Sequence, residues 1–175
     1  QSTTGVAVST GNISTHGITG RAATGLYAVP DYVPQEVFDQ ERWDPAGTAP
    51  DMEWEFIASG AGTYTVNLFM GNGFGGTSAA GQRVFDIIIE GVLVEDDLDL
   101  SATLGHQVGG MFTYEVEVTD GVLDIDFGAV VENPLVNAIE IIGPAPAPGA
   151  DTIAPVITEI AVQPLSTDPG NDQPL

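Results

Sequence analysis

The stretch Phe112-Thr-Tyr-Glu-Val-Glu-Val-Thr-Asp-Gly-Val-Leu-Asp-Ile-Asp-Phe127 decides the fold class of this 175-residue chain. Apolar residues alternate with polar ones on both sides of Asp120-Gly121, which is the pattern of strands that bury one face. An Asp-Gly pair between two such runs is typical of a tight hairpin turn. The stretch therefore predicts a β-hairpin, with Leu123, Ile125 and Phe127 directed toward a core.

The same alternation recurs elsewhere along the chain, and it predicts further strands within residues 52–56, 64–70, 83–90 and 137–142. Helical periodicity is absent, apart from a turn or two within residues 34–42. Many short strands separated by Gly-rich turns are typical of all-β domains. We therefore expect an antiparallel β-sandwich of the jelly-roll, galactose-binding-like type, formed by residues 1–143, with an extended C-terminal tail.

The composition changes after Gly143. Residues 144–150 are rich in Pro, Ala and Gly, which predicts an extended linker. Residues 151–175 begin with a strand-like pattern but are too few for a second domain of this kind. They are either the start of a following immunoglobulin-like repeat or a strand that docks on a neighbour, and an unpaired strand edge favours association.

The charge is strongly one-sided: 25 Asp and Glu stand against three Arg and no Lys, a formal net charge of -22. This charge disfavours nucleic acid and anionic membrane surfaces as partners, and no apolar run is long enough to insert into a membrane. The scattered acids favour a solvated surface suited to a salty medium, hence a marine or halophilic source. Calcium at residues 95–99 is the alternative interpretation, since hard cations bind carboxylates; no other cofactor is predicted.

Three segments, in this order, resemble malectin and malectin-like carbohydrate-binding domains. They are Phe38-Asp-Gln-Glu-Arg-Trp43, the run from Tyr64-Thr-Val-Asn-Leu-Phe69 through residues 81–99, and the run from Asp120 to Glu140. The resemblance implies a β-sandwich that binds a neutral oligosaccharide among loop aromatics and one acidic residue. Such a domain is a binding module and not an enzyme.

Carried over residue by residue, the resemblance places the carbohydrate site at Trp43, Phe74, Glu132 and Tyr27. Phe74 matches one of two adjacent loop aromatics of the family, and the other falls on Gly73. Tyr27 matches a further tyrosine, with Tyr32 as the alternative. Aromatic rings suit the C–H faces of sugars, and a carboxylate accepts hydrogen bonds from hydroxyl groups.

The remaining distinctive residues have structural interpretations. Trp54 alternates with acids and is expected in the core, whereas Arg42 and Arg83 are expected to hold acids such as Glu41 or Asp86 in ion pairs. No nucleophile–histidine–acid motif is present. The sequence therefore predicts a non-catalytic carbohydrate-binding module of a larger secreted or cell-surface protein. The alternative is a structural subunit of an extracellular fibre, surface layer or adhesin, assembled through residues 151–175.

Overall fold

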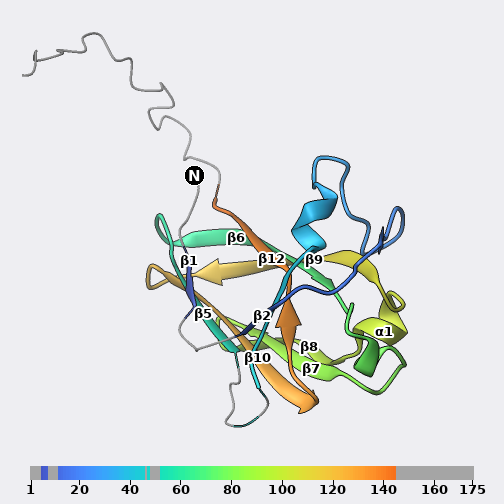
Figure 1. Cartoon of the computed structure of the whole chain (residues 1–175). Coiled ribbons are helices and arrows are strands. Elements are labelled where there is room, and N and C mark those ends of the chain that lie inside the picture. Colours follow the sequence, from blue (N-terminus) through green and yellow to red (C-terminus); the bar gives the residue numbers. More distant parts are fainter. Residues whose placement is uncertain (1–4, 8–11, 46, 48–51, 145–175) are drawn as a thin grey trace, which may run out of the picture. The chain divides into compact units, whose positions relative to one another are not determined.

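The computed structural model describes residues 5–7, 12–45, 47 and 52–144, and these residues form the fold described below (Figure 1). The linker predicted beyond Pro144 and the segment 151–175 lie outside them. Both interpretations of that segment therefore stay predictions.

Two larger sheets and one small sheet make up the domain. The first sheet has the strand order β1 (Gly5–Ala7), β5 (Met52–Ile57), β10 (Val122–Val131), β7 (Val84–Ile89), β8 (Val92–Leu98). The second has the order β12 (Ala138–Ile142), β6 (Gly62–Gly71), β9 (Val108–Val118), β3 (Gly20–Arg21). The small sheet has the order β11 (Leu135–Val136), β4 (Glu41–Trp43), β2 (Asn12–Ser14). The described strands pair antiparallel except β3 with β9, so the predicted antiparallel sandwich is confirmed.

The hairpin predicted at Asp120-Gly121 is wrong. The turn there joins β9 to β10, which belong to different sheets: β9 pairs with β6, and β10 pairs with β5 and β7. Both strands bury an apolar face in the same core, from opposite sides. Alternation along the sequence is the same for paired strands and for facing strands, so the pattern could not separate the two cases.

A true hairpin joins β7 and β8 instead. Its turn residues are Glu90 and Gly91, with φ of 52° and 70°. Two consecutive left-handed residues are what a tight two-residue turn between antiparallel strands requires.

The main core lies between the two larger sheets. One layer comes from Tyr64, Val66, Leu68 and Met70 of β6 with Phe112 and Val118 of β9, and the other from Phe85, Ile87, Ile89, Leu123, Ile125 and Phe127. Phe85 and Phe127 meet with their ring centroids 6.2 Å apart. The inward positions predicted for residues 123, 125 and 127 are confirmed, since all three are at most 1% exposed.

A smaller apolar cluster covers the outer face of the second sheet. Phe69 points outward from β6 and packs edge-on against Phe38, which ends the 3-10 helix η1 (Gln35–Phe38). This helix lies within the range predicted to hold a turn or two of helix. Two further short elements, η2 (Gly75–Thr77) and α1 (Leu100–Thr103), fall outside that range. They correct the expected helix content, because four or fewer residues leave no periodic pattern to detect.

Within the described ranges, every helix is too short to cross a membrane.

Candidate binding pocket

A pocket of about 240 Å³ lies where the small sheet meets the loops that follow β6 and β10. It is lined by Ser14, His16, Glu41, Trp43, Phe74, Arg83, Glu132 and Asn133. Three of the four residues predicted from the resemblance, Trp43, Phe74 and Glu132, are therefore brought together from distant parts of the chain. A larger and more open groove of about 560 Å³ is lined by residues such as Glu36 and Asp39 but by no aromatic side chain.

Strand β4 supplies two lining residues because its side chains alternate. Glu41 and Trp43 face the pocket, whereas Arg42 between them faces the other side. Ser14 of β2 lies opposite Glu41 in the antiparallel register. The Trp43 indole Nε1 donates a hydrogen bond of 2.8 Å to Ser14 Oγ, which fixes the orientation of the ring.

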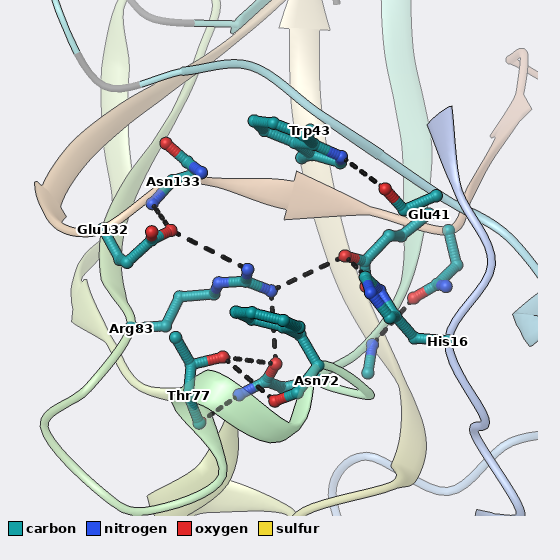
Figure 2. Close-up of polar contacts among 12 residues, drawn as sticks. His16, Glu41, Trp43, Asn72, Thr77, Arg83, Glu132 and Asn133 are labelled. Carbon is teal, nitrogen blue, oxygen red and sulfur yellow. Dashed lines mark hydrogen bonds and ion pairs between the residues drawn. The ribbon is translucent and has the colours of Figure 1, made fainter. Parts of the chain in front are cut away.

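The buried guanidinium of Arg83 organises the polar side of the pocket (Figure 2). Arg83 immediately precedes β7 and is only 4% exposed. Its Nη1 lies 3.8 Å from Glu41 Oε1 and donates a hydrogen bond of 3.2 Å to Asn72 Oδ1, while its Nη2 lies 3.9 Å from Glu132 Oε2. Burial lowers the pKa of Arg83, and the two carboxylates oppose this effect. The ion pair expected between Arg83 and Glu41 is present.

Glu41 is 2% exposed, which is unusual for a carboxylate. The pKa of Glu41 is raised, because the effect of burial exceeds the opposing effects of Arg83 and His16. His16 Nδ1 lies 2.9 Å from Glu41 Oε1. The His16 imidazole and the Arg83 guanidinium thus lie beside the same carboxylate oxygen, and they offset part of the cost of burying this acid.

The loop after β6 is held by Asn72, which is 1% exposed. Its Nδ2 donates to Thr77 O and to Ser101 Oγ, and its Oδ1 accepts from Thr77 Oγ1. This network fixes the glycine-rich loop that carries Phe74. The pattern of glycines in the sequence indicated a loop but not these anchors.

His16 packs against Gly73, the position on which the second loop aromatic of the resemblance falls. A Cβ built on Gly73 would meet His16 Cβ at 2.7 Å, so a larger residue at 73 requires the chain to shift. The His16 ring instead lies 5.3 Å from the ring of Phe74, centroid to centroid. His16 was missed in the sequence because residues 15–19 lie outside any alternating run; the glycine in place of an aromatic was the only indirect signal.

Tyr27 and Tyr32 are not among the residues that line this pocket. The Tyr27 ring lies at the margin of the main core, with its centroid 4.4 Å from that of Phe112 and its plane tilted by 34°. Tyr32 is 67% exposed, and its hydroxyl donates to Glu140 Oε2. The structure therefore does not bring the predicted tyrosine to the other three residues.

Arg42 and Trp54 stack on the opposite side of β4. The Arg42 guanidinium lies 5.0 Å from the centre of a Trp54 ring and 3.6 Å from Asp44 Oδ2. Trp54 is partly buried and packs against the main core, as expected from its alternation with acids. Both residues are thus structural, and Arg42 pairs with Asp44 instead of the expected Glu41 or Asp86.

The acidic residues within 95–99, where the sequence offers calcium binding as an alternative, have different contacts in the structure. Carboxylate oxygens of Asp86, Asp96 and Asp97 lie within 4.8 Å of one another, and Asp86 Oδ1 accepts a hydrogen bond from the backbone of Asp97. Asp99 instead caps α1 by accepting from Ala102 N. Calcium usually takes six to eight oxygens, about twice what three single carboxylate ligands offer. Calcium binding stays a prediction for this cluster.

The fold and the pocket define a β-sandwich domain with an aromatic and acidic pocket beside its small sheet. The malectin domain family matches residues 15–144, and the chain belongs to this family. No curated protein sequence matches the chain at a comparable level of significance.

Solved structures with a similar fold include plant receptor kinases and a bacterial glycosidase. The plant receptor-like kinase FER matches with a TM-score of 0.59 and 23% identity, over 75% of this chain and 39% of that one. The ANXUR1 extracellular domain from Arabidopsis thaliana matches with a TM-score of 0.61 and 17% identity, over 77% and 39%. Bacteroides uniformis beta-glucuronidase 2 matches with 0.56 and 20%, over 78% and 14%. The chain thus spans well under half of each of these proteins, and the similarity concerns the fold.

Proposed function

We propose that this domain binds a glycan in the pocket between Trp43 and Glu132, as a non-catalytic module of a secreted or cell-surface protein. One observation carries the proposal. Two aromatic residues and an exposed carboxylate from three separate segments line the same small pocket. An aromatic face beside a hydrogen-bonding acid is the combination that a sugar ring requires.

The arrangement of the acids favours binding over hydrolysis. Glycosidases place two carboxyl groups on either side of the scissile bond, and one of them must deliver a proton. Here Glu41 and Glu132 are both paired with the same guanidinium of Arg83, and Glu41 is nearly inaccessible. Both carboxylates are therefore held by Arg83, which lies between them. They are poorly placed to act on a glycosidic bond.

An extracellular location is proposed from the structural relatives, among which are ectodomains of receptor kinases. A single shallow site of this size is expected to bind with a dissociation constant of about 10 μM to 1 mM. Attachment to a larger protein would then supply avidity on a polysaccharide surface.

Titration calorimetry against a panel of neutral α- and β-linked oligosaccharides tests the proposal. We expect saturable binding that weakens at least about tenfold in Trp43→Ala, because the ring face is lost. Trp54→Phe is the matched control: Trp54 packs on the other side of β4, so the affinity should stay unchanged. Absence of binding across the whole panel, with folded wild-type protein, would refute the proposal.

A further inference from the structure

The chain has no arginine or lysine without a nearby acid to receive an acidic sugar. It contains three arginines and no lysine, and each arginine lies near a carboxylate. Arg21 lies 3.7 Å from Asp31, Arg42 lies 3.6 Å from Asp44, and Arg83 lies between Glu41 and Glu132. An anionic ligand would therefore have to break an existing ion pair to gain one of its own.

In the pocket itself, Arg83 looks at first like a site for a carboxylate, but its charge is already shared. Both terminal nitrogens face acids, Nη1 also donates to Asn72, and the side chain is 4% exposed. Its Nε has no hydrogen-bond partner but is enclosed by protein. A ligand in the pocket consequently meets little of the positive charge.

The negative charge is more accessible than the positive one. Glu132 is 41% exposed and lines the pocket together with Glu41, Arg83 and His16. His16 and Arg83 both lie beside Glu41 Oε1, whereas Glu132 is the carboxylate that a ligand can reach. The pocket is small, about 240 Å³, so a charge anywhere on a bound sugar ring lies within a few ångströms of Glu132. The net charge of the whole chain, -22, is negative as well, so it also disfavours an anionic ligand.

From these contacts we infer that the pocket selects glycans by charge: amino sugars bind best, neutral sugars less tightly and uronic acids worst. This inference rests on the proposed glycan-binding function and names the ligand class of the same pocket. An ammonium group on the sugar faces Glu132 and the aromatic rings, both of which favour a cation. A carboxylate on the same ring faces Glu132 with no free counter-charge.

The test uses three forms of one disaccharide: the neutral sugar, an analogue with one hydroxyl replaced by an amino group, and an analogue with its primary alcohol oxidised to a carboxylate. Titration calorimetry at a pH where the amine is protonated gives three dissociation constants. We expect the amino and the acidic forms to differ at least about tenfold at low salt. The difference should shrink to about threefold or less between about 50 mM and about 0.5 M NaCl, because exposed charges are screened.

Glu132→Gln keeps the shape and one acceptor oxygen but removes the local charge, so the ratio between the acidic and the amino form should move toward one. Glu55→Gln is the matched control, since Glu55 is exposed on β5 and changes the net charge by the same amount. The ratio should be unaffected there. If the control moves it as much as Glu132→Gln, the selection comes from the whole chain and the pocket assignment is overturned.

The outcomes separate this inference from the proposal on which it rests. If the neutral form binds but the acidic form binds equally well or better, charge selection is wrong and glycan binding stands. If none of the three forms binds folded protein, both fail. If Glu132→Gln loses all affinity, the wild-type salt dependence still tests charge selection, and Glu55→Gln still tests whether the charge of the whole chain causes it.

Discussion

Strands β7 and β10 run from the apolar interior of the sandwich to the pocket, and the two regions that they connect are stabilised in different ways. In the middle, Phe85 and Phe127 face each other, both fully buried. At the end, Arg83 precedes β7, Glu132 follows β10, and a buried guanidinium meets two carboxylates. The interior is stabilised by the burial of apolar surface, whereas removing charged groups from water at the pocket costs stability. The predictions below address this difference.

The largest effect is expected in the interior. Phe127→Ala should lower the free energy of unfolding by about 4 kcal/mol, because a fully buried ring leaves a cavity that its neighbours fill only in part. Urea denaturation measures the change. Val92→Ala, at a residue that is 61% exposed, should cost less than about 0.5 kcal/mol. Similar values for the two variants would mean that the facing sheets do not form the core described.

Arg83→Met should lower the free energy of unfolding by about 3 kcal/mol, because it leaves the buried carboxylate of Glu41 without its cation. A second substitution, Glu41→Leu, should recover a good part of this loss, since the unpaired charge is then removed as well. Arg21→Met is the control at a more exposed ion pair and should cost about 1 kcal/mol or less. Strictly additive losses in the Arg83 and Glu41 double variant would argue against a coupled pair.

The buried hydrogen bond between Tyr114 and Glu95 should make the stability of the fold fall at alkaline pH. The Tyr114 hydroxyl donates to Glu95 at 2.9 Å, and burial, followed by the charge of Glu95, raises its pKa above the ordinary 10.0. Above pH 10 the unfolded chain loses this proton while the folded chain keeps it, so stability falls as pH rises. The slope is at most about 1.4 kcal/mol per pH unit for one group.

Tyr114→Phe should remove this part of the slope between neutral pH and the alkaline range, measured by urea unfolding at each pH. At neutral pH the loss should be about 1 kcal/mol, the value of one hydrogen bond. Tyr32→Phe is the comparison at an exposed tyrosine whose pKa is also raised, by burial and by Glu140, and it should change the slope less than Tyr114→Phe does. An unchanged slope in Tyr114→Phe would show that its hydroxyl ionises as readily in the folded protein.

The smallest effect on stability is expected at Glu132, where the backbone is left-handed with φ of 63°. Glu132→Gly should leave the free energy of unfolding within about 0.5 kcal/mol of the wild type, since relief of that conformation offsets the loss of a long ion pair whose carboxylate is 41% exposed. Glu132→Ala keeps the unfavourable φ and should be about 1 kcal/mol less stable than the glycine variant. Both should bind the proposed glycan more weakly. If Glu132→Gly were as unstable as Phe127→Ala, Glu132 would contribute to stability as much as a core residue, and this prediction would be wrong.

Much of the interior followed from the sequence, whereas little of the pocket's polar framework did. Alternation predicts that Leu123, Ile125 and Phe127 point inward, because a strand with one buried face must place apolar residues at every second position. It does not predict which strand lies beside or opposite another, and the turn at Asp120-Gly121 was misassigned for that reason. Sheet membership depends on contacts between distant residues, which no local pattern records.

The pocket residues lie where the alternation stops. Trp43, Phe74 and Glu132 were predicted from a family resemblance, and the structure places them around one pocket. His16 and Asn72 carry no periodic signal, and their roles depend on the packing of Gly73 and on the loop that Thr77 closes. Tyr27 has an aromatic ring suited to either location, and its packing against Phe112 could be known only from the fold.

Strand β6 runs from a point beside Pro144 to the loop at the pocket. Its first residue, Gly62, lies beside Pro144, and its last, Gly71, precedes the loop anchored by Asn72 at the pocket. Ten residues of strand separate these points by about 30 Å. A tether attached at Pro144 should therefore leave the pocket facing away from the attachment point, so that the pocket stays open to ligand in solution. A tether attached beside Trp43 would block the pocket entrance.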